Sequence, residues 1–133
     1  MGESITESNK VLTVLAFDFG GKRVGLAVGN TLTKSAQALV VLTYKNKAQL
    51  FEAIKDVVDE WSPDLLLVGL PTHPDGRPHD MTQQAVRFAN QLEGRFGRKV
   101  IYVDERYSTV AISHSDDSKV AAGLAEQYLN SLT

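Results

Sequence analysis

The chain contains no cysteine, no long apolar run and no strong excess of either charge. Without cysteine there can be no disulfide bond and no thiolate metal site, which is what we expect in the reducing cytoplasm. A membrane-spanning helix needs about 20 consecutive apolar residues, so we expect no contact with a membrane. The first ten residues are polar and lack the apolar core of a signal peptide, and they predict a flexible N-terminal tail over 1–10.

The balance of charges limits the ways in which this protein can bind a polyanion. Its 14 basic and 16 acidic residues give a net charge of −2. Binding to nucleic acid would therefore depend on a local basic patch or on metal ions. With 43% apolar and 23% charged residues, the composition is that of an ordinary globular protein, and 133 residues suit one domain, which we expect over 11–133.

Apolar residues follow two periods along the chain, and together they predict five strands and three helices. Short continuous apolar runs indicate strands, whereas apolar residues three or four positions apart indicate helices. The expected strands are 11–19, 23–30, 35–44, 64–71 and 99–105, and the expected helices are 46–61, 80–96 and 116–131. Tight turns such as Gly20-Gly21 predict that the first three strands are antiparallel. The later strands are each reached through a helix, which predicts that they are parallel. The sequence therefore predicts an α/β fold with a five-stranded mixed sheet flanked by helices.

Carboxylates stand at the ends of two of these strands. Asp18 lies near the end of the most apolar strand, and Asp104 and Glu105 lie at the end of the fifth. Ligands of open α/β sheets collect at the carboxyl ends of parallel strands, so these groups reach one rim if the two strands are neighbours. At 100° per residue, Asp117 shares the buried face of the last helix with Ala121, and we expect it to point inward.

Three carboxylates at one point would repel each other, by about 4 kcal/mol for a pair ~4 Å apart at an effective dielectric constant of 20. Raised pKa values or divalent cations would offset this repulsion. Oxygen ligands favour Mg²⁺ or Mn²⁺, and two such ions about 3.5–4 Å apart can hold the attacking water and the leaving oxygen of a phosphodiester. Each carboxylate alone also has a simpler interpretation, as a turn residue, a helix cap or, for Glu105, an ion pair with Arg106.

Five segments together resemble one family, the YqgF/RuvX family, whose members are described as Holliday-junction resolvases and as pre-16S ribosomal RNA nucleases. The resemblance covers nearly all of residues 11–131. Its segments are "AFDFGGKRVGLAVG" at 16–29, "DLLLVGLP" at 64–71 with "DG" after it, "RFANQLEGRFG" at 87–97, "VDERYST" at 103–109 and "DSKVAAGLAEQYL" at 117–129.

The resemblance implies a ribonuclease H-like fold and a metal-dependent endonuclease. It implies that Asp18, Glu105 and Asp117 are the catalytic, metal-binding residues, holding two Mg²⁺ or Mn²⁺ ions. It also implies contacts from Lys22, Arg23 and Arg106 to nucleic acid, either a ribosomal RNA precursor or branched DNA. The ribosome is a further expected partner, and a homodimer would suit cleavage of both strands of a junction.

Two departures from the family pattern affect these expectations. His73 stands in "THPDG", where the family carries an asparagine, and an exposed histidine without a function is the simpler interpretation. Between "DERYST" and Asp117, the family's longer, glycine-rich basic stretch is almost absent, and His114 in this segment is weak evidence for a metal ligand. Loss of cationic contacts would weaken binding to a nucleic-acid backbone. The alternative function is therefore a catalytically impaired nucleic-acid- or ribosome-binding protein of the same fold.

Overall fold

In the part of the chain that it describes, residues 11–20, 22–70, 82–104 and 117–132, the computed structural model contains five strands and three helices. All eight lie where the sequence predicts them, with ends that differ by at most two residues. The expected tail over 1–10 lies outside the described residues. The elements are β1 (Thr13–Phe19), β2 (Arg23–Asn30), β3 (Ala36–Thr43), α2 (Lys47–Trp61), β4 (Leu65–Leu70), α3 (Thr82–Phe96), β5 (Lys99–Asp104) and α4 (Asp117–Asn130).

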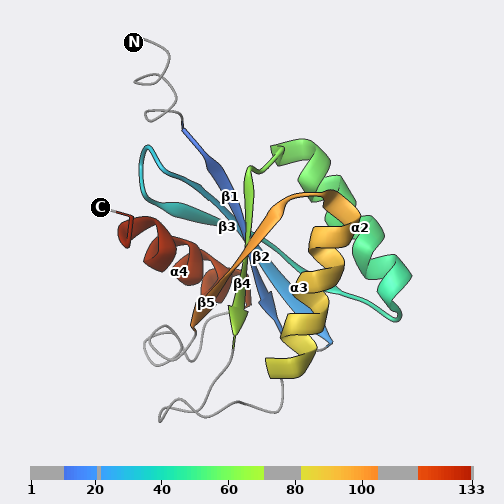
Figure 1. Ribbon diagram of the computed structural model, residues 1–133. Helices are drawn as coiled ribbons and strands as arrows, with labels where there is room; N and C mark the ends of the chain where they lie inside the picture. The colour runs from blue at the N-terminus through green and yellow to red at the C-terminus, as the bar shows by residue number, and fades with distance from the viewer. Residues whose placement is uncertain (1–10, 21, 71–81, 105–116, 133) are drawn as a thin grey trace.

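The five strands form one mixed sheet in the order β3-β2-β1-β4-β5. β2 is antiparallel to both β1 and β3, whereas β4 is parallel to both β1 and β5. The predicted mixed sheet is thus confirmed, with β1 at its centre (Figure 1). The sequence left the strand order open, and the structure shows that β4 separates β1 from β5. We call the edge where Phe19, Thr43, Leu70 and Asp104 end their strands the carboxyl edge.

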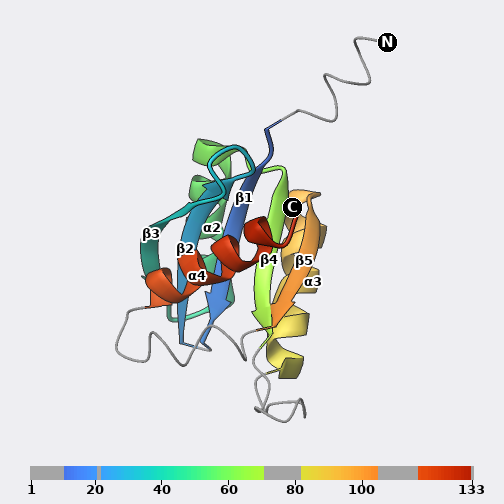
Figure 2. The same cartoon turned by 90° about the vertical axis from the view of Figure 1, so that its left-hand side faces the viewer.

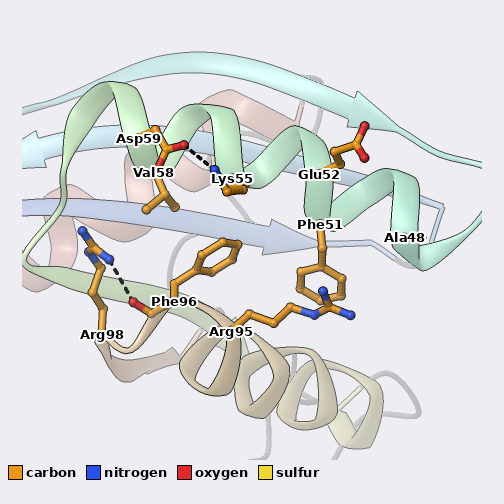
Figure 3. Close-up of a pocket in the computed structure, with 9 residues that line it drawn as sticks. All are labelled: Ala48, Phe51, Glu52, Lys55, Val58, Asp59, Arg95, Phe96 and Arg98. Carbon is orange, nitrogen blue, oxygen red and sulfur yellow. Dashed lines mark hydrogen bonds and ion pairs between the residues drawn. The ribbon is translucent and has the colours of Figure 1, made fainter.

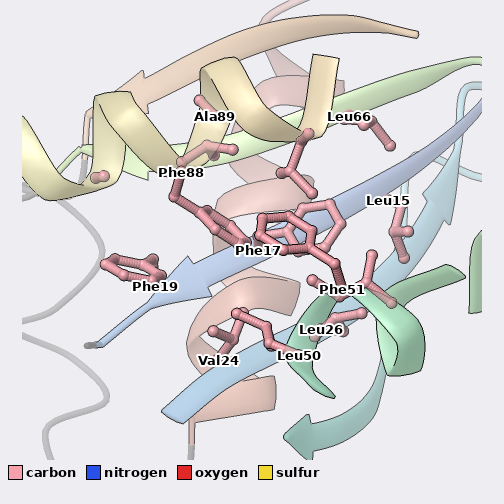
Figure 4. Close-up of a cluster of buried hydrophobic side chains, with 14 of the residues drawn as sticks. Leu15, Phe17, Phe19, Val24, Leu26, Leu50, Phe51, Leu66, Phe88 and Ala89 are labelled. Atoms are coloured by element: carbon pink, nitrogen blue, oxygen red, sulfur yellow. The ribbon is translucent and has the colours of Figure 1, made fainter. Parts of the chain in front are cut away.

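One side of the sheet is covered by α2 and α3, and the side chains between them form a core rich in aromatic rings (Figure 4). Phe88 of α3 lies at its centre, with ring centroids 5.8 Å from Phe17, 4.7 Å from Phe19 and 5.8 Å from Phe51. Because side chains alternate along a strand, Phe17 and Phe19 fix the end of β1 while Asp18, between them, points to the other side.

The other side of the sheet is covered by α4, which crosses β2 and β1 obliquely (Figure 2). Its buried residues are small or branched, and they meet small residues of the strands; this core comprises Val14, Ala16, Ala27, Leu67, Val103, Ala121, Leu124, Ala125 and Leu129. The approach is close at Gly29, where a β-carbon would lie 3.0 Å from Cδ1 of Leu129. Among the described residues, no helix combines the length and apolarity that crossing a membrane requires.

Candidate active site

Asp18 lies one residue before the end of β1, half-buried and on the α4 side of the sheet. Both of its cross-strand neighbours are glycines. On β2 its partner is Gly25, and on β4 the pairing of Phe17 with Val68 puts Gly69 beside it. Since neither glycine has a side chain, the two adjacent strands leave space around the Asp18 carboxylate on the side that faces α4.

Asp104 ends β5 at the same edge, two strands away from Asp18. Two strand spacings amount to about 10 Å, so the carboxyl ends do converge, although β1 and β5 are not neighbours. Val103 packs on the α4 side and Val100 on the α2–α3 side, so alternation directs the Asp104 side chain away from the side of Asp18. The Asp104 carbonyl accepts a hydrogen bond from Nε2 of Gln127 in α4, at 3.3 Å.

The other expected acidic residues lie partly outside the described structure. Glu105 is not among the described residues, and neither are Arg106, His73 and His114. Asp117 is described as the first residue of α4, which lies on the same side of the sheet as Asp18, but its side chain is not described. Within the described part of the chain, no three histidine, aspartate or glutamate side chains form a group that could hold a metal ion.

The expected nucleic-acid-binding residues Lys22 and Arg23 are exposed and follow Asp18 around the β1–β2 turn. The turn is tight, with the Gly20 amide donating to the Arg23 carbonyl at 2.8 Å. Arg23 lies two positions from Gly25 on β2 and hence on the same side as Asp18, at the diagonal separation of about 7–8 Å. The structure therefore brings one cation and the Asp18 carboxylate to the same side of the carboxyl edge.

A pocket of about 620 Å³ between α2 and α3 lies on the opposite side of the sheet from Asp18 (Figure 3). Four of its charged side chains, those of Lys55, Asp59, Arg95 and Arg98, have protein partners. Lys55 pairs with Asp59 at 2.8 Å, and the Arg95 guanidinium lies 4.4 Å from the ring centre of Phe51. Arg98 donates to the carbonyls of Pro63 and Phe96. This pocket brings no set of convergent carboxylates together, so the candidate active site is the Asp18 edge.

Solved structures with a similar fold include Thermus thermophilus RuvC in complex with a Holliday junction substrate, with a TM-score of 0.62 and 13% identity over 91% of this chain and 95% of that one. The fowlpox virus resolvase in complex with Holliday junction DNA has a TM-score of 0.58 and 10% identity, over 91% of this chain and 99% of that one. At these identities the likeness establishes the fold, and it agrees with the expected ribonuclease H-like architecture.

Relatives with much higher identity come from Burkholderia. A Burkholderia lata protein named "Putative pre-16S rRNA nuclease" is 52% identical over 135 residues, which cover 91% of each chain. A Burkholderia vietnamiensis protein of the same name is 62% identical over 98 residues, which cover 74% of this chain and 66% of that protein. The family model described as "RuvX: Holliday junction resolvase" matches residues 12–131. This confirms the resemblance found in the sequence, and the chain belongs to the RuvX family.

Proposed function

We propose that this protein is an endonuclease that hydrolyses phosphodiester bonds of structured nucleic acid, with Asp18, Glu105 and Asp117 as its acidic residues. The observation that carries the proposal is the position of Asp18, held by a stiff apolar strand at the carboxyl edge and flanked by Gly25 and Gly69. A carboxylate fixed at the end of a stiff strand, with no side chain on either flanking glycine, is well placed to hold a ligand.

Between the two acidic residues at the end of β5, we assign the catalytic function to Glu105. Asp104 lies four positions after Val100 on β5, so its side chain points to the same side of the sheet, the side that faces α2 and α3. This directs Asp104 away from Asp18, which lies on the side of Val103 and α4. We therefore take Glu105 rather than Asp104 as the partner of Asp18, and Asp117 as the third acidic residue because α4, which it begins, covers the side of the sheet that carries Asp18.

The donor set suits Mg²⁺ or Mn²⁺, since it consists of carboxylate oxygens and the chain contains no cysteine. Asp18, Glu105 and Asp117 would hold two ions, which when bound supply Lewis-acid polarisation of the phosphodiester and a more acidic water. Asp18 contributes a fixed oxygen, because Phe17 and Phe19 hold the backbone on either side of it. Arg23, and less specifically Lys22 and Arg106, would orient the substrate by contacts to its phosphates.

Precursor ribosomal RNA is the substrate we favour, because the relatives that share half of their residues with this chain are named for pre-16S rRNA. We accordingly propose a cytoplasmic protein that meets the ribosome during its assembly. Branched DNA is the second candidate, favoured by the family description and by the fold shared with RuvC. Cleavage of both strands of a junction would suit a homodimer.

The test uses a labelled pre-16S rRNA fragment and a labelled four-way DNA junction, each with Mg²⁺, Mn²⁺ or EDTA. We expect the wild type to cleave in a metal-dependent way and Asp18→Asn to lose at least about 100-fold in rate with its binding retained. Asp56→Asn, the same change at an exposed position on α2, is the matched control and should cleave at the wild-type rate. Equal rates for Asp18→Asn and wild type would refute the assigned site. Binding without cleavage under every metal condition would support the impaired, nucleic-acid-binding alternative.

A further inference from the structure

A second pocket opens at the carboxyl edge, on the α2–α3 side of the sheet, and nothing above assigns it a function. Its volume is about 360 Å³. Phe19 at the end of β1 forms one wall, and the segment from Tyr44 to Lys47, which joins β3 to α2, forms another. Gln84 and Arg87 from the start of α3 complete it. The pocket therefore lies where β1, the β3–α2 connection and α3 meet.

The described side chains that line this pocket carry charge of one sign only. Its charged side chains are Lys45, Lys47 and Arg87, all exposed, and no carboxylate is among the described residues that line it. The first turns of α2 and α3 contain no acidic residue either. In contrast, the pocket between α2 and α3 in Figure 3 mixes Glu52 and Asp59 with its basic residues. Three cations gathered in a chain of net charge −2 form a local anion-attracting site.

The pocket and the candidate active site lie at the same edge of the sheet, on its two opposite sides. Its wall residue Phe19 directly follows Asp18 in β1, and alternation turns the two side chains to opposite sides. Arg23 pairs with Thr43 across β2 and β3, next to Tyr44 at the rim of the pocket. The carboxyl edge therefore carries Asp18 and Arg23 on its α4 side and the three cations of the pocket on its α2–α3 side.

We propose that this pocket binds the sugar-phosphate backbone of the nucleic-acid substrate, on one side of the bond held at Asp18. Cations gathered in a pocket suit the phosphates of a strand, and each contact contributes affinity without reading the sequence. The half-buried ring of Tyr44 gives the pocket an aromatic surface beside its cations, the combination that holds unpaired bases. This inference rests on the proposed function, because it takes the substrate of that site to be the ligand.

The Tyr44 phenol carries its proton under ordinary conditions. Burial raises the pKa of Tyr44 above its usual value, because the phenolate would lose hydration in this position. A neutral phenol adds no negative charge to the pocket, so the three cations keep their full attraction for a phosphate.

The test measures binding without cleavage, as the fluorescence anisotropy of a labelled pre-16S rRNA fragment in EDTA between 50 and 300 mM salt. The variants are Lys45→Gln/Lys47→Gln and the same pair combined with Arg87→Gln. The matched control is Lys34→Gln/Lys99→Gln, which removes two charges at the opposite edge of the sheet. All five positions are on the surface of the fold and outside the buried cores, so every variant should fold.

We expect each lost pocket charge to weaken binding about fivefold at 0.1 M salt. The plot of log affinity against log salt should flatten by about 0.7–0.9 per charge. The control should stay within about twofold of the wild type. Pocket variants that behave like the control would overturn the proposal, and so would a wild type that does not bind the RNA. Because EDTA removes cleavage from the assay, a wild type that binds through the pocket but never cuts would refute only the nuclease function.

Discussion

Asp18 and Gly25 face each other across β1 and β2, so the strand beside the proposed catalytic carboxylate presents no side chain to it. Gly69 repeats this arrangement on β4. None of the positive backbone φ angles in the described structure falls at Gly25, so the conformation of this strand does not require glycine there. The absence of a side chain next to Asp18, rather than backbone strain, is therefore the physical reason that we assign to this glycine.

Gly25→Val tests this reason directly. Valine favours a strand, and its side chain would stand about 4.5–5.5 Å from the Asp18 β-carbon, in the space assigned to ions and phosphate. We expect cleavage to fall about 100-fold, since small displacements of reacting groups have effects of that size. RNA affinity in EDTA should change by less than about threefold. A Gly25→Val protein that folds, binds and cleaves like the wild type would show that this space has no catalytic use.

Gly29→Ala should destabilise the protein by about 1–3 kcal/mol, because the added methyl group would clash with neighbouring atoms. It would lie 2.7 Å from the carbonyl oxygen of Ser35, a backbone atom that cannot rotate away, and 3.0 Å from Cδ1 of Leu129. Gly94→Ala is the matched control. It lies in α3 with no atom within 4 Å of its added methyl group, and should stabilise by about 0.5–1 kcal/mol. Thermal and urea unfolding measure both; shifts of the same sign would contradict the packing argument.

The order and type of the elements could be predicted from the sequence because the apolar periods of this chain are clear. Leu50, Ile54 and Val58 are buried at the predicted helical spacing. Phe51 was not predicted to be buried, yet it packs against Phe88, since α2 is covered by α3 as well as by the sheet. The strand order was left open because it depends on which helix crosses which strand, and a single sequence has no local signal for that.

The candidate site could be predicted only in part. The position of Asp18 near the end of a buried strand was apparent from the sequence and is confirmed, but the glycine neighbours depend on strand register. The pocket lined by Lys45, Lys47 and Arg87 could not be predicted, because in the sequence Lys45 and Lys47 resemble any polar connection between a strand and a helix. One signal could have indicated it. The register of the β2–β3 hairpin pairs Arg23 with Thr43, and this pairing puts the segment that contains Lys45 and Lys47 beside the β1–β2 turn.

Asp64→Ala should lower the stability by about 0.5–1.5 kcal/mol, because Asp64 ties the start of β4 to the start of β1. Its carboxylate accepts from the Thr13 amide at 2.9 Å, while its own amide donates to the Thr13 carbonyl at 2.8 Å. The site is exposed, so water replaces part of what is lost. Urea unfolding measures the change, and Asp64→Asn, which retains a side-chain acceptor, should recover most of it. A similar loss in both variants would mean that the hydrogen bond is not the cause.

Asn46→Asp should move the stability and the nucleic-acid affinity in opposite directions. Asn46 caps α2, where its side-chain oxygen accepts from the Gln49 amide at 2.8 Å, and it also lines the basic pocket. Aspartate caps a helix as well as asparagine does, and its charge near the N-terminus should add about 0.3–1 kcal/mol of stability. The same charge, placed among Lys45, Lys47 and Arg87, should weaken RNA binding in EDTA about fivefold at 0.1 M salt.

Asn46→Ala separates the two effects, because it removes the cap without adding a charge. We expect it to lower the stability by about 1 kcal/mol and to leave RNA affinity within about twofold of the wild type. Thermal unfolding and anisotropy on the same preparations measure both quantities. If Asn46→Asp bound RNA as tightly as Asn46→Ala, a negative charge in the pocket would have no effect on the substrate, and phosphate binding there would be refuted even though the cap behaved as predicted.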